Sequence, residues 1–195
     1  MGGTFDPIHY GHLVAAEGAR YEFNLEKVIF VPAGRPPHKP KWHVTDPWQR
    51  FEMTVLAVQS NPFFQALSLE VERRGPSYAI ETVREIALLN PGVQVYFITG
   101  ADAVSEILTW KNTEELLSIC CFIAATRPGY RLEDMWEKLD RLPIGLKNNI
   151  FCMEVPALAI SSSDIRQRLR EGRPVKYLLP ELVEEYIAKN NIYRC

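Results

Sequence analysis

A stretch near the start of the chain, GGTFDPIHYGHL (residues 2–13), places two histidines three positions apart where a glycine-rich turn leads into a helix. His9 and His12 can project from one face of that helix toward the same point. The positive end of the helix dipole faces the turn, and imidazoles donate hydrogen bonds to phosphate oxygens. The pattern favours an anion site, with Pro7 beginning the helix and Gly11 leaving room for a base or sugar.

Two other interpretations of the histidine pair stay open on spacing alone. One is an ordinary helix start with two solvated histidines. The other is a zinc pair, but this would need further ligands, and no carboxylate or cysteine is spaced to supply them. We therefore predict no metal ligand among the side chains.

A second anion-suited helix start lies far downstream in ISSSDIRQRLREG, residues 160–172. Ser161 and Ser162 offer capping hydroxyls, and Asp164 complements the first turn. The guanidinium of Arg166 can reach back over the helix start, where it would suit bidentate binding of a phosphate. The alternative is a serine-capped surface helix whose arginines only aid solubility.

The elements that must position these residues follow from the hydrophobic pattern. Apolar, β-branched runs predict strands at 27–34, 65–72, 93–102, 119–129 and 150–157, and three-and-four spacing predicts helices at 48–60 and 78–89. Such an alternation indicates an α/β fold with a Rossmann-like, doubly wound parallel sheet and helices on both faces. Ligands then bind beyond the carboxyl ends of the strands. The Pro-rich segment 34–47 is expected to be an exposed loop.

Length and composition fit a single domain over residues 1–195. The net charge of −2 gives no basic field, so nucleic acid and anionic membranes are not expected partners. No apolar run approaches the ~20 residues needed to span a bilayer, and we expect a cytoplasmic protein. The four cysteines form no CxxC pair and are expected to be buried free thiols.

Both motifs together resemble the HxGH nucleotidyltransferase superfamily, and the chain is most similar to its bacterial nicotinate-nucleotide adenylyltransferase family. The supporting segments occur in order along nearly the whole chain: PPHK (36–39), RRGPSYAIET (73–82), FITGADA (97–103), ILTWKN (107–112), ATRPGY (125–130) and LLPELVEEYI (178–187). The resemblance implies transfer of an adenylyl group from ATP to nicotinate mononucleotide, which gives deamido-NAD and pyrophosphate. It also implies Mg²⁺, carried by the ATP phosphates.

The same resemblance implies roles for individual residues. His12 would contact the α-phosphate, and His9 and Arg166 the rest of the triphosphate. The other residues implied for ATP are Gly3, Thr4, Phe5, Ser161 and Ser162 at the phosphates, Gly100 and Asp102 at a ribose, and Arg127 and Gly129 at the adenine. The residues implied for nicotinate mononucleotide are Lys39, Ser77, Tyr78, Ala79 and Trp110, of which Trp110 would stack on the pyridine ring.

The chain departs from the family pattern in two places. Ala79 stands where a threonine is usual, so one hydroxyl donor to the nicotinate carboxylate is missing, and a water or Ser77 would have to replace it. Related chains carry an apolar strand before the GGTFDP turn, where this sequence has only Met1, so we expect the sequence to be truncated upstream and to lack the first central strand of the sheet. A protein that began at Met1 should be poorly stable and have little activity.

Two rival functions remain open. Pantetheine-phosphate adenylyltransferase uses the same two motifs but lacks the GPSY and Trp110 segments, and a non-catalytic nucleotide-binding module would have less need for His9, His12 and Arg166 together. A tRNA synthetase fragment fits worse, because no KMSKS-like signature is present. The amphipathic segment 178–190 is compatible with packing on the parent sheet or with a homo-oligomer.

Overall fold

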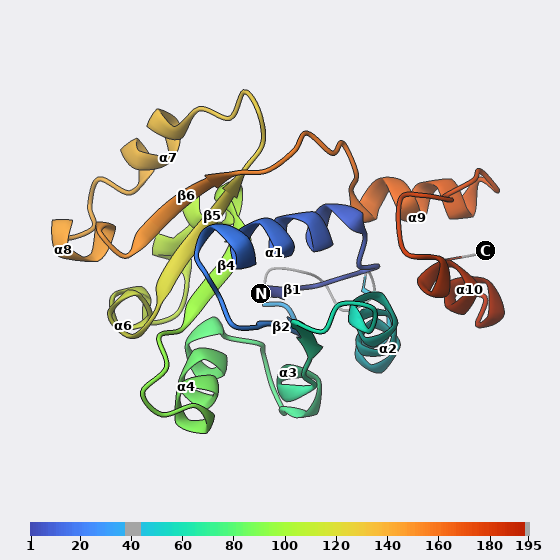
Figure 1. The fold of residues 1–195 in the computed structure, drawn as a ribbon, viewed down its shortest axis with the longest axis horizontal. Coiled ribbons are helices and arrows are strands. Elements are labelled where there is room, and N and C mark those ends of the chain that lie inside the picture. Colours follow the sequence, from blue (N-terminus) through green and yellow to red (C-terminus); the bar gives the residue numbers. More distant parts are fainter. Residues whose placement is uncertain (38–43, 194–195) are drawn as a thin grey trace. The chain divides into compact units, whose positions relative to one another are not determined.

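The computed structural model describes residues 1–37 and 44–193 of the chain. Its residues form two compact units: the Ser77 unit comprises Met1–Gly2 and Ser77–Ala157, and the Gly3 unit comprises Gly3–Pro76 and Leu158–Cys195. The strands are grouped in two three-stranded sheets with helices packed around them (Figure 1). The expected α/β class is confirmed.

One sheet has the strand order β1-β2-β3, with β1 at Gly2–Gly3, β2 at Val28–Pro32 and β3 at Phe64–Ala66. β2 and β3 run parallel, with Val28 opposite Phe64. The helices of the Gly3 unit are α1 (Tyr10–Glu22), α2 (Pro47–Val58), α3 (Leu69–Glu72), α9 (Ser162–Arg170) and α10 (Glu181–Lys189). Val28, Phe30 and Val31 are all buried, as expected of a strand covered on both faces.

The sheet of the Ser77 unit is parallel throughout and has the order β4-β5-β6, with β4 at Tyr96–Gly100, β5 at Cys121–Thr126 and β6 at Ile150–Glu154. Its helices are α4 (Ala79–Leu89), α5 (Ala101–Ser105), the short 3₁₀ helix η2 (Ile107–Thr109), α6 (Thr113–Ile119), α7 (Leu132–Lys138) and α8 (Ile144–Lys147). On β5, Phe122 and Ala124 point to one face and Ile123 to the other, and all three are fully buried. Both faces of this strand are therefore covered.

Three local expectations differ from the structure. The run 65–72 is a strand only at its start, because the chain turns at Ser68 and forms α3 instead. Pro7 does not begin a helix: it follows a cis Asp6–Pro7 bond, and α1 begins at Tyr10. Gly2 and Gly3 form a short extended strand rather than a tight turn, so the first strand of the sheet is represented by two residues.

The amphipathic C-terminal segment packs within its own unit. α10 lies against α2, as Figure 1 shows, and buries Val183 and Ile187. The apolar stripe of α10 therefore has a partner inside the chain. The α2 helix itself begins at a cap, because the carboxylate of Asp46 accepts from the backbone N–H of Trp48 at 2.9 Å.

The cysteines that the structure describes are free thiols. Cys120 is buried, its Sγ donates to the carbonyl of Leu116, and burial, with the neighbouring Cys121, raises its pKa to about 12. Cys121 and Cys152 are half-buried, and burial raises their pKa too.

At pH 8 the Cys120 thiol should stay protonated, and only the thiolate is nucleophilic. We expect iodoacetamide to leave Cys120 unmodified in the native protein and to label it fully in denaturant, as measured by peptide mass spectrometry. Equal labelling rates in the two states would contradict the burial of this side chain.

Candidate functional site

The start of α1 holds the two histidines in a fixed arrangement. His9 is the N-cap residue, and its backbone N–H donates to Nδ1 of His12 at 3.2 Å. The two rings stack with centroids 3.8 Å apart, and the Phe5 ring meets His12 edge-on at 5.0 Å. Because Nδ1 of His12 accepts a hydrogen bond, the neutral ring carries its proton on Nε2. His12 thus presents a defined N–H donor.

The start of α9 is tied to the same turn. The Ser162 hydroxyl donates to the carbonyl of Pro7 at 2.9 Å, and Nη1 of Arg166 donates to the carbonyl of Asp6 at 2.6 Å. Ser161 caps α9 by accepting from the N–H of Asp164 at 3.2 Å. The starts of α1 and α9 therefore lie together, as Figure 1 shows, although they are about 150 residues apart in the sequence.

The sequence predicts each of these two helix starts to suit an anion, and the structure places both at the same turn. It brings His9, His12, Ser161, Ser162 and Arg166 around one turn of the Gly3 unit. Oriented backbone N–H groups, an imidazole donor and a guanidinium form a suitable site for a polyanion.

The turn itself is shaped by close packing. Phe5 adopts a positive φ of 49°, and a Cβ on Gly3 would lie 2.8 Å from its ring. A residue with a side chain at position 3 would therefore clash with the Phe5 ring, which explains the glycine. A Cβ on Gly11 would lie 3.0 Å from the His9 ring. The missing side chain at this position therefore makes room for His9, and not for a base or sugar as expected. Thr4, between Gly3 and Phe5, offers its carbonyl to a buried arginine.

That arginine, Arg50 of α2, was missed by the sequence analysis. It is fully buried, and its guanidinium donates to three backbone carbonyls, those of Thr4 at 2.7 Å, Thr45 at 2.9 Å and Gly34 at 3.3 Å. Burial lowers its pKa, and the nearby carboxylate of Asp6 opposes that shift. Arg50 also lines a cavity of about 550 Å³ with Arg35.

Asp6 and Tyr193 were also missed. Asp6 is buried, its Oδ1 accepts from the Tyr193 hydroxyl at 2.6 Å, and its Oδ2 lies 3.9 Å from Nη1 of Arg166. Burial and the charge of Asp6 raise the pKa of Tyr193, so its phenol remains a donor. The motif marks Asp6 only by its place in the turn, and no sequence signal links it to Tyr193.

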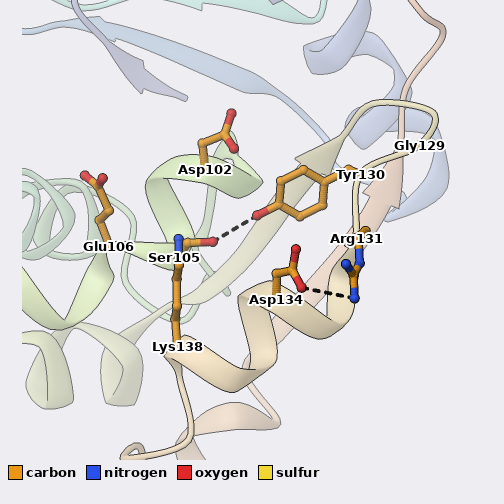
Figure 2. Close-up of a pocket in the computed structure, with 8 residues that line it drawn as sticks. All are labelled: Asp102, Ser105, Glu106, Gly129, Tyr130, Arg131, Asp134 and Lys138. Atoms are coloured by element: carbon orange, nitrogen blue, oxygen red, sulfur yellow. Dashed lines mark hydrogen bonds and ion pairs between the residues drawn. The ribbon is translucent and has the colours of Figure 1, made fainter.

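In the Ser77 unit, residues at the carboxyl ends of two strands line one cavity of about 420 Å³ (Figure 2). Asp102 follows β4 on α5, and Gly129 follows β5 with a positive φ of 84°. A Cβ on Gly100 would meet nothing within 4 Å, which leaves space beside the strand end. The structure thus brings Asp102 and Gly129 to one pocket, as expected of a parallel sheet.

The remaining lining of this cavity is mostly charged. The hydroxyls of Ser105 and Tyr130 form a hydrogen bond of 2.9 Å, and Arg131 lies 3.5 Å from the carboxylate of Asp134. Figure 2 marks both interactions with dashed lines. Arg127 is exposed at the turn before Tyr130, whose N–H donates to its carbonyl at 2.9 Å, and it does not line the cavity.

The residues expected at the nicotinate ring are half-buried in the Ser77 unit. Trp110 packs edge-on against Phe97 and Phe122 at 5.8 and 6.1 Å, so one part of the ring belongs to the core. Tyr78 is the N-cap of α4, and the Lys111 ammonium lies 4.2 Å from its ring. Ser77 and Ala79 flank Tyr78 at the start of α4. Lys39 lies outside the described residues.

No group of three or more His, Cys, Asp or Glu side chains that could hold a metal ion is found among residues 1–37 and 44–193. Over the same residues, no helix has both the length and the apolar character to cross a membrane.

Comparisons with known proteins agree with this arrangement. The cytidylyltransferase-like family model matches residues 1–168. A protein of Moorella thermoacetica named "probable nicotinate-nucleotide adenylyltransferase" is 58% identical over all of this chain and 90% of its own length. A Thermoanaerobacter protein of the same name is 56% identical, over all of this chain and 92% of its own.

The fold matches that of a solved structure. Plasmodium falciparum nicotinic acid mononucleotide adenylyltransferase, complexed with NaAD, superposes with a TM-score of 0.77 at 21% identity, over 98% of this chain and 94% of that one. This likeness confirms the Rossmann-like nucleotidyltransferase fold. The chain therefore belongs to the cytidylyltransferase-like nucleotidyltransferases and, within them, to the nicotinate-nucleotide adenylyltransferase family.

Proposed function

We propose that this protein transfers the adenylyl group of ATP to nicotinate mononucleotide, with deamido-NAD and pyrophosphate as products. A phosphate oxygen of the mononucleotide attacks the α-phosphorus of ATP, and the bond to the departing pyrophosphate breaks. The observation that carries the proposal is the meeting of the α1 and α9 starts in a chain 58% identical to a named relative.

The chemistry asks little of the protein beyond positioning and charge stabilisation. The second pKa of a phosphate monoester is about 6, so the attacking group is already anionic at neutral pH and needs no general base. The two anions must be brought together, and the charge that builds on the α-phosphate and pyrophosphate must be stabilised. Fixed N–H donors perform both tasks.

In the Gly3 unit we assign the triphosphate to the turn and the two helix starts. Nε2 of His12 would donate to the α-phosphate, and His9 and Arg166 to the remaining phosphates. The two serines at the α9 start and the backbone of residues 3–5 complete this set, namely Gly3, Thr4, Phe5, Ser161 and Ser162.

In the Ser77 unit we assign the ribose and adenine to the ends of β4 and β5. Asp102, exposed and lining the cavity, would accept from a ribose hydroxyl beside Gly100. Arg127 and Gly129 would border the adenine. For the mononucleotide we assign Trp110, the α4 start at Ser77, Tyr78 and Ala79, and Lys39.

We propose that Mg²⁺ arrives on the triphosphate with most of its waters, since this ion needs few protein ligands. The chain's own residues bind the phosphates around it. We further propose a cytoplasmic enzyme in which residues 1–195 act as one domain. A single cooperative unfolding transition, the same by circular dichroism and tryptophan fluorescence, would support one domain, and two transitions would refute it.

The test is release of pyrophosphate from ATP and Mg²⁺ with three acceptors in parallel: nicotinate mononucleotide, nicotinamide mononucleotide and phosphopantetheine. Turnover with the first alone supports the proposal. Turnover with the last alone would identify a pantetheine-phosphate adenylyltransferase. ATP binding without turnover on any acceptor would indicate a non-catalytic nucleotide-binding module.

Comparable rates with nicotinate mononucleotide and nicotinamide mononucleotide would be explained by Ala79, because this residue offers its backbone N–H but no hydroxyl to the nicotinate carboxylate. The ratio of kcat/KM for the two mononucleotides measures this preference directly.

Replacement of Trp110 by alanine should raise KM for nicotinate mononucleotide roughly tenfold with little change in kcat, because ring stacking is lost. Steady-state kinetics with each substrate varied would check it, and KM for ATP should stay the same. Trp110→Phe keeps a flat ring, so its KM for nicotinate mononucleotide should lie between those of the unmodified protein and Trp110→Ala. The matched control is Trp48→Ala on α2, whose side chain is 49% exposed. An unchanged KM would leave Trp110 as a packing residue of the core.

A further inference from the structure

We propose that Asp6 and Tyr193 are positioning residues for Arg166: the Tyr193 hydroxyl anchors the buried Asp6, and Asp6 aims the guanidinium. The inference deepens the proposed function, because it rests on Arg166 binding the triphosphate. It assigns a role to a residue 187 positions from Asp6 in the sequence and close to the C-terminus.

Arg166 is held by Asp6 at two points. Nη1 donates to the backbone carbonyl of Asp6 at 2.6 Å, and the same nitrogen lies 3.9 Å from Oδ2 of the carboxylate. The Arg166 side chain is 23% exposed, against 4% for that of Asp6. One edge of the guanidinium is thus fixed to the turn, and its other N–H groups remain for a ligand.

Asp6 is in turn fixed from two sides. Its Oδ1 accepts from the Tyr193 hydroxyl at 2.6 Å, and its Oδ2 faces the backbone N–H of Thr45 at 3.4 Å. Arg50 adds a favourable charge nearby. With both carboxylate oxygens engaged, rotation of the carboxyl group is restricted, and the plane facing Arg166 is set.

Loss of the Tyr193 hydroxyl would release one of these two restraints and leave a buried carboxylate short of a donor. Asp6 would then shift or take up water, and Arg166 would lose its fixed orientation. Small displacements of a donor cost most where charge develops on the reacting phosphate. The effect should therefore appear in ATP use and not in mononucleotide binding, which involves other residues.

The decisive experiment is a double-mutant cycle of Tyr193→Phe with Arg166→Lys. Tyr193→Phe alone should lower kcat/KM for ATP about tenfold, raise Kd for Mg-ATP severalfold by calorimetry, and leave KM for nicotinate mononucleotide within about twofold. In the Arg166→Lys background the same change should alter ATP use by less than about twofold, because the group that Tyr193 positions is already gone. Asp6→Asn, which keeps the backbone carbonyl but removes the charge, should behave like Tyr193→Phe.

Equal losses in both backgrounds, or a parallel rise of both KM values, would overturn the inference in favour of a purely structural hydrogen bond. The matched control is Tyr21→Phe on α1, 79% exposed, which should change neither parameter. If Tyr193→Phe folds poorly, the cycle with Asp6→Asn decides. If the unmodified protein binds ATP but transfers nothing, the proposed function fails, and the cycle measured on Kd for Mg-ATP still decides the inference.

Discussion

Replacement of His12 by alanine is expected to lower kcat by at least ~10²-fold, in line with the loss of one preorganised donor at a charge-developing centre. The contact between Nδ1 of His12 and the N–H of His9 leaves Nε2 as the donor, and the Phe5 and His9 rings hold the imidazole in place. Because this donor needs no rearrangement before reaction, its loss should fall mainly on kcat and less on KM. Pyrophosphate release at saturating ATP and mononucleotide measures it.

The control for His12→Ala is Tyr21→Ala at the far end of the same helix, which should retain wild-type kcat. Adding free imidazole to the His12→Ala assay should recover part of the lost rate, since the replaced ring leaves a space of its own size between Phe5 and His9. Near-normal kcat in His12→Ala, with an unchanged melting temperature, would remove His12 from the chemistry.

Much of the fold followed from the sequence because its signals are local. The apolar runs predicted β2, β4, β5 and β6, and the helical spacing predicted α2 and α4, each within a few residues. The run 65–72 misled because apolar residues at 67, 69 and 71 fit both a strand and a short helix, and only packing decides between them. Pro7 misled because its fixed φ suits a turn as well as a helix start.

In the candidate site, too, the features with local sequence signals could be predicted and those that depend on distant partners could not. The anion-suited helix starts were visible because capping and dipole effects depend on neighbours in sequence. Asp6, Arg50 and Tyr193 were not, since, apart from Thr45 beside Arg50, their hydrogen-bond partners lie 16 to 187 positions away in the sequence. One signal for Arg50 was present: it occupies the buried stripe of α2 with Met53, Thr54, Ala57 and Val58, and a charge on an apolar stripe points to a specific partner.

Replacement of Arg50 by methionine is expected to lower the free energy of unfolding by roughly 3–5 kcal/mol. Methionine fills much of the volume but has no N–H, so the carbonyls of Thr4, Thr45 and Gly34 lose their donor in a buried place. Arg50→Lys keeps a charge without the planar fork and should lose about half as much. Urea unfolding followed by circular dichroism measures both.

Substitution of Arg50 should also lower activity, because Arg50 holds the carbonyl of Thr4. That carbonyl lies in the turn that carries Phe5 and Asp6, so a turn no longer held by Arg50 should position His12 and Arg166 less accurately. We expect Arg50→Lys to reduce kcat while the protein remains folded. The matched control is Arg84→Met on α4, whose ion pair with Glu115 is exposed, so its loss should leave the free energy of unfolding nearly unchanged. An Arg50→Met protein as stable as the Arg84→Met control would show that these three carbonyls find other donors, and that the turn does not depend on the buried arginine.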